Sequence, residues 1–115
     1  MEIKAEIPRK VSVAESDLCV LLSNALENAL HACQKLKEKH QTAVIEVTVY
    51  EKNGKLLLQI VNSCEEEIHF AGELPVTEEP GHGMGVRSIC AVVEKYQGIY
   101  NFIVKDGNFI LRVSL

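Results

Sequence analysis

The pattern of hydrophobic and polar positions changes its period along the chain, and each change predicts a new element. Residues 1–7 alternate apolar and charged side chains, which predicts a half-buried strand. From Asp17 to about Lys37 the apolar positions recur every three or four residues, which predicts a helix with one buried side. That side consists of Leu18, Leu21, Leu22, Ala25, Ala29, Ala32 and Leu36. We expect Ser12 or Ser16 to cap the N-terminus of this helix.

Two β-rich segments follow the helix and predict a hairpin. They cover residues 43–51 and 55–62, and Asn53 and Gly54 join them. Asn-Gly is typical of a type I′ turn, because both central residues of that turn need positive φ. A second hairpin is predicted over residues 99–115 by the same kind of pattern, with Asp-Gly at its turn.

The segment between the two hairpins contains a long loop and a second helix. Residues 63–85 are rich in proline and glycine and have no sustained period, which is typical of a functional or a disordered loop. The apolar side of the helix that follows consists of Val86, Ile89, Val93 and Tyr96. Gly98 is placed to end it. The order of elements predicts a two-layer α/β sandwich, with a mixed sheet of about five strands and its helices on one face.

Composition restricts the class of protein. The chain of 115 residues is 47% hydrophobic and 24% charged, the balance of a single soluble globular domain over residues 1–115. No apolar run reaches the roughly 20 residues that a membrane span needs. The net charge of −4 argues against nucleic acid as the main partner. The four cysteines form no CxxC pair, so we expect reduced thiols and no zinc site.

The first predicted helix carries an unusual polar face. Asn24, Asn28 and His31 lie at i, i+4 and i+7, with Glu27 beside them. Asparagine is a poor helix former, so two of them in the middle of a helix indicate a purpose other than helix stability. Amide oxygens beside a carboxylate suit a hard cation such as Mg²⁺, which keeps waters and phosphate oxygens as further ligands. A polar stripe without function is the alternative.

A second candidate site lies at residues 81–85, which read Gly-His-Gly-Met-Gly immediately before the second predicted helix. Alternating glycines let backbone N–H groups approach an anion, and a helix N-terminus adds positive potential. This pattern is neither a P-loop nor a dinucleotide-binding fingerprint. A flexible loop without a ligand is the alternative.

Taken together, the two features resemble the GHKL ATPases, which have the Bergerat fold, and above all the catalytic ATP-binding domains of bacterial sensor histidine kinases. Residues 24–29 resemble the N box of that family, and residues 81–85 followed by 86–89 resemble its glycine-rich G2 box. The resemblance covers nearly the whole chain. It implies a domain that binds Mg·ATP and transfers the γ-phosphoryl group to a histidine.

The resemblance also implies roles for single residues. Asn28 would coordinate Mg²⁺, Asn24 would support the phosphates or the metal, and Glu27 would be the catalytic base. The glycines would let a lid close over the phosphates. The residues implied to bind ATP are Asn24, Asn28, His31, Asn62, Gly81, His82, Gly83, Gly85, Val86 and Arg87.

One position departs from the family pattern. Most members have an aspartate that accepts a hydrogen bond from the adenine amino group, followed by glycines, whereas this chain has Asn62 and no glycines directly after it. The amide oxygen of Asn62 can accept the same hydrogen bond, but a bond to a neutral acceptor is weaker. Asn-Ser here and His-Gly in the lid resemble the subgroup that includes peptide-sensing quorum receptors.

The resemblance further implies partners that lie outside this chain. No histidine here is followed by an acidic residue, the usual form of a phosphoacceptor, so the acceptor would lie on a separate dimerisation domain. We therefore expect a monomeric cytoplasmic fragment of a membrane-bound receptor that signals to a response regulator. Two other functions stay open: a stand-alone serine kinase of the anti-sigma type, and a degenerate nucleotide pocket used as a protein-interaction module.

Overall fold

The structure is a computed structural model, which describes residues 2–5, 13–64, 70–72, 74–75 and 83–115. Its elements are β1 (Glu2–Ala5), α1 (Glu15–Glu38), β2 (Ile45–Lys52), β3 (Lys55–Ser63), β4 (Phe70–Ala71), β5 (Leu74–Pro75), α2 (Gly83–Lys95), β6 (Ile99–Lys105) and β7 (Asn108–Ser114). The predicted helices and hairpins are therefore present, with small shifts at their ends. The short β4–β5 pair, which forms a separate two-stranded sheet, was not expected.

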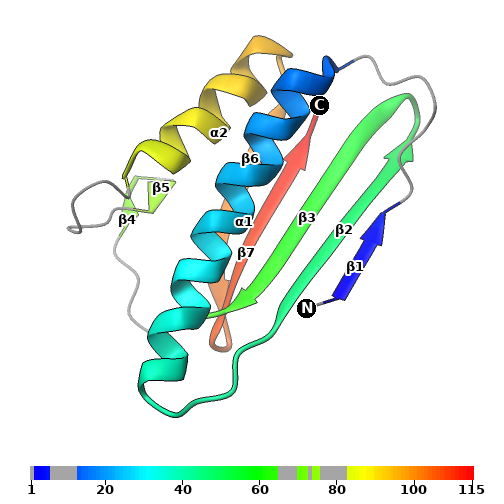
Figure 1. Cartoon of the computed structure of the whole chain (residues 1–115). Coiled ribbons are helices and arrows are strands. Elements are labelled where there is room, and N and C mark those ends of the chain that lie inside the picture. Colours follow the sequence, from blue (N-terminus) through cyan, green and yellow to red (C-terminus); the bar gives the residue numbers. More distant parts are fainter. Residues whose placement is uncertain (1, 6–12, 65–69, 73, 76–82) are drawn as a thin grey trace.

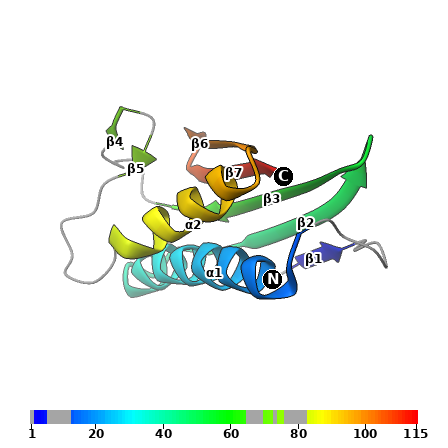
Figure 2. The same ribbon diagram turned by 90° about the horizontal axis from the view of Figure 1, so that it is seen from above.

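The main sheet has five strands in the order β1-β2-β3-β7-β6. The strand β1 runs parallel to β2, and the other neighbours are antiparallel. Both helices lie side by side on one face of this sheet (Figures 1 and 2). The prediction of a two-layer α/β sandwich with a mixed sheet is confirmed.

The core lies between the sheet and the helices because the strands alternate their side chains. Along β3, Leu56, Leu58, Ile60 and Asn62 are buried, while the residues between them are half-buried on the other face. The helix α1 contributes an almost continuous apolar side to the same core: Leu18, Leu21, Ala25, Ala29, Cys33 and Leu36. The helix α2 adds Ile89 and Val93, which are fully buried.

Both predicted hairpin turns are confirmed by their backbone angles. Asn53 and Gly54 have φ values of 55° and 76°, and Asp106 and Gly107 have values of 52° and 75°. Positive φ at both central residues is the requirement of a type I′ turn, and its twist matches that of the flanking strands.

The prediction for the N-terminal cap of α1 was wrong. The helix begins at Glu15 and Ala14 is the cap residue, without a side-chain hydrogen bond to the helix. Ser16 lies inside the first turn, and Ser12 lies outside the described residues. The backbone N–H of Ala14 instead donates to the Tyr96 hydroxyl at 3.0 Å. A contact from the other end of the chain therefore replaces the local cap.

The ends of α2 also differ from the prediction. The helix begins at Gly83, so Gly83 and Gly85 lie in its first turn and not in a loop before it. The buried residues that follow stabilise the helix against the low helix propensity of glycine. At the other end, Gln97 and not Gly98 has positive φ, 55°. Gly98 donates its N–H to the Val93 carbonyl at 2.9 Å.

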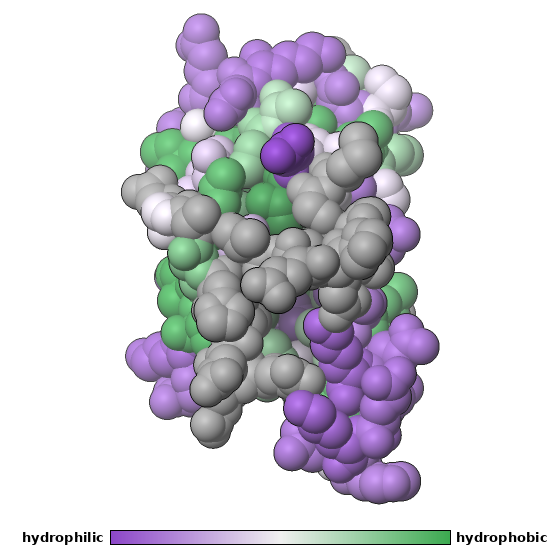
Figure 3. All heavy atoms as spheres, turned by 90° about the vertical axis from the view of Figure 1, so that its left-hand side faces the viewer, coloured by the Kyte–Doolittle hydropathy of each residue, from purple (hydrophilic) through white to green (hydrophobic). Residues whose placement is uncertain are grey.

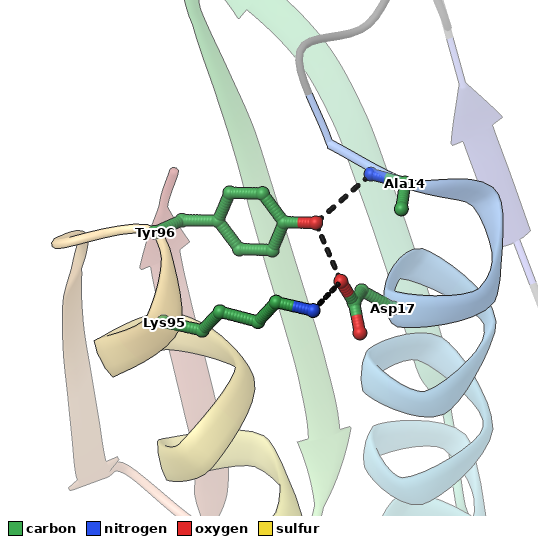
Figure 4. A network of polar contacts seen from close by, with 4 residues as sticks. All are labelled: Ala14, Asp17, Lys95 and Tyr96. Atoms are coloured by element: carbon green, nitrogen blue, oxygen red, sulfur yellow. Dashed lines mark hydrogen bonds and ion pairs between the residues drawn. The ribbon is translucent and has the colours of Figure 1, made fainter.

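A polar network, which we call the clasp, joins the start of α1 to the end of α2 (Figure 4). The Tyr96 hydroxyl donates to the Asp17 carboxylate at 2.5 Å, and the Lys95 ammonium lies 2.8 Å from the same oxygen. The hydrogen bond from Lys95 lowers the pKa of Asp17 most, and the bond from Tyr96 lowers it further. The Asp17 carboxylate in turn raises the pKa of Lys95.

The clasp predicts a pH dependence of stability with a definite sign. Because the pKa of Asp17 is lower in the folded than in the unfolded protein, the ionised carboxylate stabilises the fold. This stabilisation is complete above the pKa of an ordinary aspartate, about 4, and is lost as the pH falls through the lower pKa of the folded protein. Asp17→Asn should therefore lose less stability than the parent between pH 7 and pH about 3. Urea unfolding at both pH values measures this, with the exposed Glu51→Gln as the control. Equal losses in parent and Asp17→Asn would contradict the assignment.

None of the four cysteines, all of which lie in the described part of the chain, forms a disulfide. Cys33, Cys64 and Cys90 are buried and Cys19 is exposed. Burial raises the pKa of Cys33 and of Cys90, which keeps both thiols protonated at neutral pH. In the described part of the chain, neither helix is sufficiently long and apolar to cross a membrane.

Candidate functional site

The polar face of α1 is formed as the sequence predicts. Asn24, Asn28 and His31 are half-buried, whereas Glu27 is exposed. Ala25 and Ala29 on the adjacent positions are buried and hold this part of the helix against the core. The two asparagines therefore lie at the border between core and solvent, where an amide group can contact both the protein and a ligand.

The first turn of α2 packs against this polar face at Asn24. A Cβ added at Gly85 would lie 3.6 Å from the Oδ1 atom of Asn24 and 4.0 Å from its backbone oxygen. The Asn24 amide nitrogen donates to the Val20 carbonyl at 2.8 Å, which turns the amide oxygen toward Gly85. The structure thus brings together the two sequence features that are far apart along the chain.

Other residues near the start of α2 have different surroundings. Val86 is 8% exposed, so its side chain belongs to the core and only its backbone is available to a ligand. Arg87 is exposed. Gly81 and His82 lie outside the described residues. Figure 3 shows this side of the molecule, with hydrophilic residues toward its two ends and hydrophobic ones between them.

Asn62 lies at the end of β3 on the face that the helices cover. It is 2% exposed and is the only buried polar residue in the described part of the chain. Its amide nitrogen donates to the Ser63 carbonyl at 3.1 Å, which directs the Oδ1 atom away from that carbonyl. A buried amide in an otherwise apolar layer costs stability unless its polar atoms have partners. A ligand that hydrogen-bonds Asn62 would have to reach inside the helix-covered layer.

The arrangement fits a hydrated divalent cation held beside phosphate groups. The described residues contain no group of three or more His, Cys, Asp or Glu side chains that could hold a metal ion. The polar face of α1 instead offers amide oxygens, and Mg²⁺ accepts a few such ligands while it keeps waters and phosphate oxygens. The N-terminus of α2, a helix of 13 residues, offers free backbone N–H groups to an anion. Asn24 and Asn28 are the residues that could hold the metal.

The contact between Gly85 and Asn24 predicts opposite effects of one substitution. Gly85→Ala places a methyl group at an ordinary contact distance of 3.6 Å from Asn24, so the fold accommodates it. Alanine in a helix is favoured over glycine by about 0.5–1 kcal/mol, so thermal unfolding should shift upward. The same methyl group covers the Asn24 amide oxygen, so affinity for a phosphate ligand with its bound cation should fall by about tenfold or more. A variant that is stabilised and still binds as tightly as the parent would contradict this site.

No sequence signal pointed to the clasp of Asp17, Lys95 and Tyr96, because its members lie near opposite ends of the chain. In the structure, the cap residue Ala14 has no side-chain cap, and its backbone N–H donates to the Tyr96 hydroxyl of the same network.

Comparisons with known proteins concern the family and the fold of this chain. The model of the family described as "GHKL domain" matches residues 13–115. No curated protein matches the chain. Among solved structures, the mycobacterial sensor histidine kinase MprB has a TM-score of 0.73 and 20% identity, over 99% of this chain and 78% of that one.

Two further solved structures have similar folds. The catalytic domain of histidine kinase ThkA has a TM-score of 0.74 and 15% identity, over 98% of this chain and 75% of that one. The Acinetobacter baumannii histidine kinase AdeS has a TM-score of 0.68 and 13% identity, over 99% of this chain and 52% of that one. At these identities the likeness concerns the fold.

Proposed function

This chain belongs to the GHKL domain family, and from that premise we propose that it binds Mg·ATP and transfers the γ-phosphoryl group to a histidine of a separate dimerisation domain. It is a GHKL ATPase domain with the architecture of histidine kinase catalytic domains. The finer proposal is that it acts in a two-component system and belongs to the subgroup with peptide-sensing quorum receptors.

One observation carries the proposal: the packing of the α2 N-terminus against the asparagine face of α1. Gly85 and the Asn24 amide oxygen are adjacent, so a phosphate group held at the start of α2 would lie next to the amides of α1. A site that holds a metal ion and phosphate groups together needs the ligands of both to lie side by side in this way.

The exposure of each side chain agrees with its proposed role. Asn28 is half-buried and would hold Mg²⁺, while Asn24, fixed by its bond to Val20, would support the phosphates. Glu27 is exposed on the same helix, where a histidine from another domain can reach it. Glu27 would accept the proton of that histidine, which makes its nitrogen a better nucleophile.

The remaining groups position the nucleotide. Bound Mg²⁺ would neutralise charge on the transferred phosphoryl group, which is the main chemical demand of phosphoryl transfer. The backbone N–H groups at the start of α2 would orient the phosphates, with Gly81, His82 and Arg87 as further contacts. His31 and the backbone of Val86 complete the proposed ATP-binding set. Asn62 would accept a hydrogen bond from the adenine amino group inside the helix-covered layer.

The proposal includes partners and location. The phosphoacceptor and dimerisation domain would be part of the same protein, a response regulator would receive the phosphoryl group, and the domain would lie in the cytoplasm as part of a membrane-bound receptor. The isolated domain would be a monomer.

Phosphotransfer tests the proposed reaction. The domain is incubated with γ-labelled ATP, Mg²⁺ and the histidine-bearing domain of its own full-length protein. We expect label on that domain that is lost in acid and survives alkali, as phosphohistidine is. Glu27→Gln should transfer more slowly by about 100-fold while it still binds nucleotide. Acid-stable label on a serine would instead support a serine kinase of the anti-sigma type.

A substitution at Asn62 tests the proposed adenine contact. Asn62→Asp replaces a neutral acceptor with a charged one, which should strengthen binding of adenine nucleotides by about 5- to 10-fold. Burial of a carboxylate at a position that is 2% exposed should also lower the melting temperature of the free domain. Titration calorimetry with ADP measures the first effect, and the exposed Asn101→Asp is the matched control. Unchanged affinity in Asn62→Asp would place the adenine elsewhere.

A further inference from the structure

The face of the sheet opposite the helices, which we call the open face, has an ordered pattern of side chains. Strand pairing places residues of β2, β3, β7 and β6 in rows across it. The first row consists of Tyr50, Leu57, Ser114 and Ile99. The central row consists of Thr48, Gln59, Arg112 and Asn101. The third row consists of Glu46, Val61, Ile110 and Ile103.

The open face is more apolar than a solvated sheet face. An antiparallel sheet with one face in water normally alternates apolar and polar residues along each strand, with the polar ones outside. Here six of the twelve side chains in the three rows are hydrophobic. Two of them are well exposed, Ile99 at 62% and Tyr50 at 39%. Two rows of apolar side chains on a sheet face that no helix covers are typical of an interaction site.

A shallow pocket of about 140 Å³ opens between the first and the central row. Arg112 and Gln59 form its polar part, and the Arg112 Nε–H donates to the Gln59 amide oxygen at 2.9 Å. This bond uses one of the five N–H donors of the guanidinium group and fixes its plane. The β2–β3 hairpin curves toward the side of the sheet without helices (Figure 2).

The charge of the open face is opposite to that of the whole chain. On β2, β3, β7 and β6, its strand positions carry four cationic residues and one anionic residue: Lys52, Lys55, Lys105, Arg112 and Glu46. The chain as a whole has a net charge of −4. A basic face favours an acidic partner and disfavours pairing with the same face of a second copy of this chain.

We propose that the open face binds an acidic amphipathic α-helix of a partner protein, as a third layer over the sheet. The face of a sheet has no free backbone groups to offer, because its strands bond to one another. The occupant must therefore satisfy its own backbone hydrogen bonds, which a helix does and an extended segment does not. Sheets with helices on both faces are a stable architecture, so the added layer completes one.

The spacing of the rows defines the helix that fits. The two apolar rows lie four residues apart along each strand, about 13 Å, with Arg112 midway between them. In a helix that runs along the strands, residues i and i+8 are about 12 Å apart and residue i+4 is midway. Apolar side chains at i and i+8 would contact the two apolar rows. A carboxylate at i+4 would then bind the remaining N–H groups of Arg112.

Amide NMR with a designed peptide tests this inference. The probe is a peptide of about 18 residues, long enough to form a helix, with leucine at i and i+8 and glutamate at i+4. A second peptide has lysine at i+4. We expect the glutamate peptide to shift amide resonances of β2, β3, β7 and β6. Arg112→Glu should weaken its binding at least about tenfold, and the lysine peptide should bind as weakly.

Lys37→Glu is the matched control, because it makes the same charge change at an exposed position of α1. It should bind the glutamate peptide like the parent. Nucleotide affinity should be unchanged in Arg112→Glu, which separates this face from the nucleotide site. The inference would be overturned by no binding at millimolar peptide, by equal binding of both peptides, or by shifts confined to α1 and α2. A dimer of the free domain that Arg112→Glu dissociates would also overturn it.

Discussion

Replacement of Asn28 by alanine is expected to abolish the Mg²⁺-dependent part of nucleotide binding. Asn28 is half-buried on the polar face of α1, so its amide oxygen is available to a ligand while its backbone is fixed in the middle of the helix. Loss of groups that only orient metal ligands already costs 10- to 100-fold in affinity, so loss of a ligand should cost about 100-fold or more. The fold should be unaffected, because alanine is favoured in helices.

Titration calorimetry with ADP, with and without Mg²⁺, measures the effect of Asn28→Ala, and thermal unfolding checks the fold. Gln34→Ala is the matched control, since it removes an exposed amide from the same helix. We expect it to bind like the parent. An Asn28→Ala variant that keeps the affinity of the parent in Mg²⁺ would remove this residue from the metal site.

Gly98→Ala is expected to destabilise the domain strongly. A Cβ at this position would lie 2.2 Å from the Ser114 backbone oxygen, far inside contact distance. That oxygen belongs to β7, which pairs with strands on both sides, so it cannot move without loss of hydrogen bonds. Overpacking against a fixed neighbour costs about 3 kcal/mol or more, a large part of the stability of a small domain.

Urea unfolding measures this loss, and Gly85→Ala is the matched control. It makes the same chemical change at a position where the added Cβ has only ordinary contacts. The control should unfold at slightly higher urea concentration than the parent, and Gly98→Ala at much lower concentration. A loss of stability below about 1 kcal/mol in Gly98→Ala would contradict the prediction, because it would mean that the chain at residue 98 moves away from β7 at little cost.

The sequence was sufficient for the two helices, the two hairpins and the layers, because they follow from local period and turn chemistry, whereas the short β4–β5 pair was not expected. The turn at Asn53 and Gly54 determines the register of its hairpin through backbone angles that few residues adopt. The apolar residues of α1 lie on one side of the helix, so only that side can pack against the sheet. These features depend on neighbours within a few residues and are readable from the chain alone.

The helix ends could not be predicted, because distant residues determine them. Ala14 is bonded to Tyr96 and Asp17 to Lys95, pairs that come together only in the folded sheet and helices. Gly98 was expected to end α2 through its backbone freedom, but its small size against Ser114 is what the fold needs. The sequence pattern therefore identified the glycine but not the contact with Ser114 that requires it.

The candidate site was predictable as two separate patterns. The spacing of Asn24 and Asn28 placed both amides on one helix face, and the structure has them there. The contact of Gly85 with Asn24 required the packing of α2 on α1, which no local pattern contains. The core position of Val86 and the depth of Asn62 likewise depend on the sheet and its covering helices. The roles of these residues in binding stay predictions.

Calorimetric titration of the domain with ADP and with a non-hydrolysable ATP analogue, each with and without Mg²⁺, tests the central claim most directly. The account predicts saturable binding of both nucleotides that becomes tighter when Mg²⁺ is added. Absence of binding at millimolar nucleotide would contradict it, and a pocket that survives only as a protein-interaction surface would then be the better description.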